Sequence, residues 1–137
     1  MTKDTPFEVE IVVRGYELDS FNHVNNAVFL NYFEHARWMA FKELGLARLS
    51  EEGLTTIMRK VTVEYDRPAH VFDELRLRLW IARIGRTSLT FGQDIVRKSD
   101  ASVSDDTVLA RAEVVVVCVG PDGRPHPVPE EWKPGKN

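Results

Sequence analysis

The chain contains one cysteine, Cys118, among its 137 residues. A lone thiol forms no intrachain disulfide, so the sequence lacks the usual sign of a protein that folds in an oxidising compartment. Its first residues, Met-Thr-Lys-Asp-Thr-Pro, lack the apolar stretch of a secretory signal. No apolar run approaches the roughly 20 residues needed to cross a bilayer. Together these absences predict a soluble, cytoplasmic protein.

A large excess of charge is also missing. The formal net charge is -3 at pH 7, and charged residues make up 28% of the chain. A strong overall basic field that would attract nucleic acid is therefore absent, which leaves only a local basic groove. Hydrophobic residues make up 43% of the chain, which is typical of a folded globular protein. The length fits a single domain over residues 1–137.

Alternation of apolar and polar residues predicts five strands. The first runs over residues 7–14, where every second residue is apolar. Four more are predicted over residues 57–66, 75–81, 88–98 and 108–119. The last of these ends in a valine-rich run, which predicts a central strand that is buried on both faces. A polar connection is expected at residues 99–107, and the proline-rich tail at residues 121–137 is expected to be irregular.

Between the first two strands lies a segment with helical periodicity. Residues 27–44 carry apolar side chains at steps of three and four, and further apolar positions predict cover on more than one side. Asn25 and Asn26 suit the N-cap, and Gly45 suits the C-terminal stop. One long helix on an antiparallel sheet that curls around it is an α+β arrangement and describes the hotdog fold.

The segment that leads into this helix carries the most specific pattern. It contains Arg14-Gly-Tyr16, then Asp19, then His23-Val-Asn-Asn26. The pattern resembles the 4-hydroxybenzoyl-CoA thioesterase-like group of hotdog proteins, and it is most similar to the long-chain acyl-CoA thioesterase III subtype. The similarity continues through Tyr65-Asp-Arg-Pro-Ala69, Asp73-Glu-Leu75 and Arg83-Ile-Gly-Arg-Thr-Ser88, and so covers about the first 120 residues.

The resemblance implies hydrolysis of an acyl-CoA to a free acid and CoA, with Asp19 as nucleophile or general base. It also implies that the backbone N–H of Asn26 polarises the thioester carbonyl. The first N–H groups of a helix suit this task, because they lack intrahelical partners and lie at the positive end of the helix dipole. No cofactor or metal is expected, since CoA is part of the substrate.

A second set of residues is expected to bind the substrate. The candidates are His23, Asn25, Arg59, Arg83, Gly85, Arg86, Thr87 and Ser88. The arginines suit the phosphates of CoA. By resemblance, residues 85–88 lie near the path of the pantetheine arm. His23 is expected mainly to fix the loop through a hydrogen bond.

The chain departs from the family at several positions. Many members have Gly where this chain has Asn22, and Asn tolerates the left-handed conformation, so the loop is expected to keep its shape. Other subgroups place a Tyr and a His beside the catalytic Asp, at the positions of Gly15 and Asn26 here. Because both are absent, His23 is not given that role. Glu34 is not expected to be catalytic. A different subgroup uses a Glu on the helix, but this chain lacks the His-Gly-Gly signature of that subgroup.

The resemblance also implies a homo-oligomer, a dimer or more often a tetramer, because an open sheet edge is a liability unless it is paired. The active site then lies between subunits. Two alternatives stay open: a hotdog hydratase or dehydratase acting on acyl thioesters, and a non-catalytic acyl-CoA-binding module. The acyl chain, the choice of CoA or acyl carrier protein, and the exact role of Asp19 also stay open.

Overall fold

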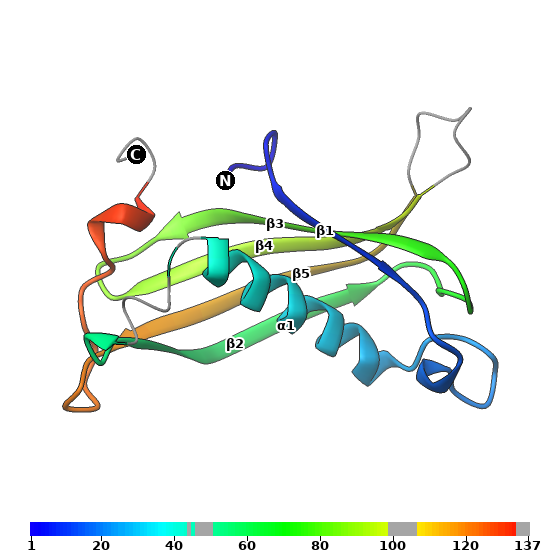
Figure 1. Cartoon of the computed structure of the whole chain (residues 1–137), viewed down its shortest axis with the longest axis horizontal. Helices are drawn as coiled ribbons and strands as arrows, with labels where there is room; N and C mark the ends of the chain where they lie inside the picture. Colours follow the sequence, from blue (N-terminus) through cyan, green and yellow to red (C-terminus); the bar gives the residue numbers. More distant parts are fainter. Residues whose placement is uncertain (44, 46–50, 99–106, 134–137) are drawn as a thin grey trace.

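The computed structural model describes residues 1–43, 45, 51–98 and 107–133. The elements follow in the order β1 (Phe7–Val12), η1 (Gly15–Glu17), α1 (Asn26–Glu43), β2 (Thr55–Tyr65), β3 (Glu74–Ile84), β4 (Ser88–Arg97), β5 (Thr107–Val119) and η2 (Glu130–Trp132). In the described part, the strands form one five-stranded antiparallel sheet of order β1-β3-β4-β5-β2, and α1 crosses one face of it (Figure 1). The predicted α+β hotdog arrangement is confirmed.

Helix α1 begins one residue before its predicted start. Asn25 is the N-cap, because its Oδ1 accepts the Ala27 N–H at 2.8 Å. Gly45 ends the helix with a positive φ of 77°, and its N–H donates to the Lys42 carbonyl at 3.2 Å. The last residue of the predicted helix, Leu44, lies outside the described residues.

One face of α1 packs against the sheet. Its buried residues are Phe29, Tyr32, Phe33, Ala36, Ala40 and Phe41, at helical spacing. They meet the inward leucines of β3 and the apolar residues of β4 and β5 in one core. Leu30 and Trp38 remain 40% and 64% exposed. The sequence predicts that apolar partners cover the helix on more than one side, but within one chain these two side chains are not covered.

The strands appear where alternation predicts them, with a difference in the middle of the sheet. β5 is an interior strand, but β4 is the central one and is buried along almost its whole length. The outward Val115 and Val117 of β5 are only half-buried. The predicted connection at residues 99–107 lies outside the described residues except for its last position. The tail is not wholly irregular, because Trp132 in η2 stacks on Phe41 of α1 at a centroid distance of 6.1 Å.

The face of the sheet away from α1 carries a row of alternating charges. The cross-strand neighbours Glu8, Arg78, Asp94, Arg111 and Glu64 run across all the strands, from β1 to β2. Arg78 and Asp94 form a bidentate pair, at 2.6 and 2.7 Å. Opposite charges on neighbouring strands stabilise such a face without an apolar cover.

Candidate active site

Asp19 lies in a tight loop between β1 and α1. Its N–H donates to the His23 carbonyl at 2.8 Å, and its Oδ1 accepts the N–H groups of Phe21 and His23 at 2.9 and 3.2 Å. Just outside this turn, Leu18 and Val24 form an isolated antiparallel bridge. The loop therefore folds back on itself and fixes the Asp19 carboxylate with its own main chain.

The loop turns at Asn22, which has a φ of 62°. The Asn22 N–H donates to the Asp19 carbonyl at 3.1 Å. Glycine and short polar residues adopt this left-handed conformation at the lowest cost. The prediction that Asn at this position preserves the turn agrees with this geometry.

The first residue of α1, Asn26, presents a free main-chain donor. Asn25 accepts the next two main-chain N–H groups of the helix. Its side chain accepts the Ala27 N–H, and its carbonyl accepts the Val28 N–H at 2.9 Å. Among the described residues, no acceptor bonds the Asn26 N–H. This donor lies at the positive end of the helix and suits an oxygen that gains negative charge.

Asp19 and Asn26 open on the same cavity, of about 210 Å³. Its lining residues are Asp19, His23, Val24, Asn26, Phe29, Tyr65, Asp66, Arg67 and Pro68. The walls thus come from the loop, from the first turn of α1 and from the end of β2. The Tyr65 hydroxyl donates to the Asn26 carbonyl at 3.0 Å, and its ring meets Phe29 edge-on at 5.7 Å. These contacts tie the end of β2 to the start of the helix.

The structure brings together three of the residues that the sequence singles out, Asp19, His23 and Asn26. The His23 ring packs edge-on against His70, with ring centroids 5.1 Å apart. The main-chain N–H of His23 donates to the Asp19 carboxylate. These contacts agree with a loop-fixing role for His23. Asn25 does not line the cavity, because its side chain caps the helix.

The remaining candidates lie elsewhere in the single chain. Ser88 pairs with Val117, which also pairs with Ile57, so the turn at residues 85–88 lies at the same end of the sheet as the start of β2, with β5 between them. The cavity lies at the other end of β2, roughly 25 Å away along the strand. Arg59 is in the β-bulge of β2, and Arg83 pairs with Glu113 on the outer face at 3.5 Å.

The four cavity residues at the end of β2 received no role from the sequence: Tyr65, Asp66, Arg67 and Pro68. They belong to the motif that ends at Ala69, and membership of this family pattern was the sequence signal that could have marked them as functional. What the pattern does not reveal is that the end of β2 meets the start of α1.

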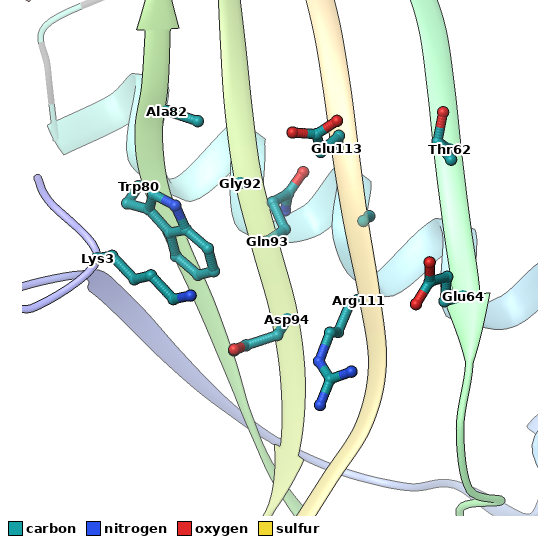
Figure 2. A pocket seen from close by; sticks show the side chains of 11 residues that line it. Lys3, Thr62, Glu64, Trp80, Ala82, Gly92, Gln93, Asp94, Arg111 and Glu113 are labelled. Carbon is teal, nitrogen blue, oxygen red and sulfur yellow. The ribbon is translucent and has the colours of Figure 1, made fainter.

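A larger cavity, of about 380 Å³, lies on the outer face of the sheet (Figure 2). Several of its charged groups already pair with side chains that do not line the cavity, Arg111 with Asp66 and Glu113 with Arg83. Asp94 is held by Arg78, and the Lys3 ammonium lies 5.9 Å from the centre of the Trp80 ring. The floor at Gly92 is filled by the same indole. The smaller cavity is therefore the candidate active site, because an N–H and a carboxylate oxygen at it have no hydrogen-bond partner among the described residues.

Within the described ranges, no three His, Cys, Asp or Glu side chains are grouped so as to hold a metal ion. The helices of the same ranges include none long and apolar enough to cross a membrane. The expected cytoplasmic location stays a prediction, as does the expected lack of a cofactor.

Comparison with known proteins identifies the class that this fold and site define as the hotdog-fold thioester hydrolases. The sequence profile of the Thioesterase-like superfamily matches residues 13–134, and the chain belongs to that family. The predicted resemblance and the predicted hydrolase class are confirmed.

Two curated relatives and one solved structure illustrate the similarity. The acyl-CoA thioester hydrolase YbgC of Escherichia coli is 33% identical over 119 residues, which are 85% of this chain and 84% of that protein. The long-chain acyl-CoA thioesterase FadM of Escherichia coli is 27% identical over 113 residues, 82% of each chain. Slr0204, a 1,4-dihydroxy-2-naphthoyl-CoA thioesterase from Synechocystis, has the same fold, with a TM-score of 0.78 at 21% identity over 93% of each chain.

Proposed function

We propose that the protein hydrolyses an acyl-CoA to a free acid and CoA, with Asp19 as the catalytic carboxylate and the Asn26 N–H as oxyanion donor. One observation carries the proposal: both groups open on one cavity, and the N–H has no acceptor among the described residues. The names of YbgC and FadM, both acyl-CoA hydrolases, support CoA as the carrier. No cofactor takes part, because CoA belongs to the substrate.

The two oxygens of Asp19 have different tasks in this proposal. Oδ1 accepts the two loop N–H groups, which fixes the plane of the carboxylate. Oδ2 receives no hydrogen bond from the described residues and is the reactive atom. It either attacks the thioester carbon to give a mixed anhydride that water then cleaves, or it takes a proton from an attacking water.

Both routes place negative charge on the thioester oxygen, and the Asn26 N–H donates to it there. Loss of one such donor typically costs about 10²–10³ in turnover. The C–S bond then breaks, and its electron pair leaves with the sulfur as CoA thiolate. A thiolate is a good leaving group, so the site needs no strong acid.

We also propose that a second copy of the chain completes the site, in a dimer or tetramer. β2 is an edge strand whose Ile57 and Val61 are 55% and 36% exposed. Antiparallel pairing of two β2 edges would set the start of one strand beside the end of the other. The turn at residues 85–88 lies at the same end of the sheet as that start, one strand further in, so the partner's Arg86 would approach the Asp19 cavity and meet the CoA phosphates.

The test is a thiol-release assay over a panel of acyl-CoA and acyl carrier protein substrates. Asp19→Asn should lower CoA release by about 10²-fold or more, with little change in melting temperature. Asp122→Asn is the matched control, because Asp122 also accepts a main-chain N–H in a turn, at 3.0 Å, but lies outside the cavity. Turnover of Asp19→Asn at the wild-type rate would refute the mechanism.

Three further measurements address the alternatives. Label found in the Asp19 carboxylate after a single turnover in ¹⁸O-labelled water would identify this side chain as the nucleophile, with water attacking the aspartyl carbon of the anhydride. An enoyl-CoA hydration assay detects the hydratase alternative, and calorimetry detects acyl-CoA binding without CoA release.

A further inference from the structure

We propose that Glu17 is a positioning residue, which sets the placement of Asp19 relative to the Asn26 N–H. Glu17 ends the short 3-10 turn η1, two residues before Asp19, and is only 6% exposed. It does not line the Asp19 cavity, so it acts on the reaction through other residues. The inference rests on the proposed function, because it concerns the geometry of that site.

The side chain of Glu17 joins the end of β1 to the helix. Its Oε1 accepts the Arg14 N–H and the Tyr32 hydroxyl, both at 2.8 Å, and its Oε2 accepts the Arg14 guanidinium at 2.9 Å. Tyr32 is a buried residue of α1. One carboxylate thus bonds the strand that leads into the loop and the helix that follows it.

The main chain of Glu17 fixes the same joint a second time. Its carbonyl accepts the Asn25 N–H at 3.0 Å. Asn25 is the N-cap of α1 and directly precedes the proposed oxyanion donor. The two ends of the Asp19 loop are therefore held together at one residue, by a side-chain and a main-chain contact.

A carboxylate is an expensive group to bury, and an apolar side chain of similar volume often stabilises a protein as well. What the carboxylate adds is direction, because its oxygens bond donors on two separate elements at fixed angles. Burial, and then the hydrogen bond to Glu17, raise the pKa of Tyr32, so its hydroxyl stays a proton donor at neutral pH.

The test compares three variants in kcat, KM and melting temperature. Glu17→Met removes the acceptors but keeps the volume, and should lower kcat by about 10–100-fold with KM changed by no more than about 3-fold, because small misplacements cost this much. Tyr32→Phe removes one bond and should lower kcat by about 3–10-fold. Glu17→Gln keeps an oxygen for Arg14 N–H and Tyr32, while the half-exposed Arg14 guanidinium can turn to solvent, and so should restore kcat to within about 3-fold.

Asp94→Asn is the matched control, because Asp94 is also 6% exposed and bonds an arginine, but on the outer face of the sheet (Figure 2). It should lower the melting temperature without lowering kcat per folded molecule. In the Asp19→Asn background, Glu17→Met should change the residual rate by less than about 3-fold, because its effect passes through the lost carboxylate.

A wild-type kcat in Glu17→Met would overturn the positioning role. So would a fall in kcat on adding Glu17→Met to Asp19→Asn that is as large as the fall it causes in the wild-type protein. A loss in Asp94→Asn as large as that in Glu17→Met would also overturn it. If Glu17→Met does not fold, the other two variants decide. Wild-type kcat in Tyr32→Phe, or a kcat in Glu17→Gln lower than that of Tyr32→Phe, would then overturn the role. Failure of the proposed function is distinct, because it shows as full turnover by Asp19→Asn alone.

Discussion

The hydroxyl of Tyr65 donates a 3.0 Å hydrogen bond to the main-chain carbonyl of Asn26. This bond joins the last residue of β2 to the first residue of α1, and both residues line the Asp19 cavity. The Tyr65 ring also rests edge-on against Phe29. Two contacts from one side chain therefore hold the start of the helix against the sheet at the point where the proposed oxyanion donor lies.

Tyr65→Phe should remove the hydrogen bond and keep the ring contact. We expect kcat to fall by about 3–10-fold, because the first residue of α1 gains freedom. Stability should change by less than about 1 kcal/mol, since the bond is exposed to water. Steady-state kinetics and urea unfolding check the two expectations. A large stability loss with unchanged kcat would show that the bond serves the fold alone.

Two inactive variants should complement each other if the site is shared between copies. Asp19→Asn removes the carboxylate of one copy, and Arg86→Ala removes the cation that the partner would contribute. In mixed dimers, a site can combine an intact Asp19 with an intact Arg86, so refolding the variants together should restore up to about a quarter of wild-type turnover. Light scattering after size-exclusion chromatography gives the mass of the assembly. No recovery in a proven mixed dimer would contradict a shared site.

Gly92→Ala should destabilise the sheet without harming the reaction. A Cβ at Gly92 would come within 2.3 Å of the Trp80 indole, which lies over it on the outer face. We expect a loss of about 1–3 kcal/mol in the free energy of unfolding, as in other overpacked sites. Gly120→Ala is the control, since its nearest atom lies 3.4 Å away. Chemical unfolding measures the difference, and kcat at low temperature should match wild type.

The thiol of Cys118 should react slowly in the folded protein. Cys118 is 3% exposed, and burial raises the pKa of its thiol. Because the folded state holds the proton more tightly than the unfolded one, this group favours folding below the ordinary thiol pKa of about 8.5, and the contribution fades at higher pH. At pH 8, Ellman's reagent should label the thiol slowly in buffer and quickly in guanidinium chloride. Rapid labelling of the folded chain would refute this burial.

The periodicity of the sequence predicts most of the architecture. Steps of three and four place α1 to within one residue at its start, and alternation places each strand to within a few residues. The centre of the sheet was misassigned, because a valine-rich run predicts burial whether a strand is central or next to the edge. Strand order depends on long-range pairing, which local patterns do not encode.

The candidate site divides in the same way. Asp19, His23 and Asn26 lie close together in the chain, so a local motif predicts that they line one cavity. Tyr65 and Asp66 reach the cavity only because β2 ends beside the start of α1. Residues 85–88 share the family pattern, yet the sheet carries them to the far end of β2 within one chain.

The sequence by itself determined the elements, the left-handed turn at Asn22 and the capped helix, because each depends on side chains a few residues apart. Only the tertiary structure decided that the Tyr32 hydroxyl would donate to Glu17 and that the Tyr65 hydroxyl would donate to the Asn26 carbonyl. Those contacts join residues that packing alone makes neighbours. The geometry of the candidate site is therefore a property of the packed sheet and helix, even though its proposed reacting groups, Asp19 and the Asn26 N–H, lie close together in the chain.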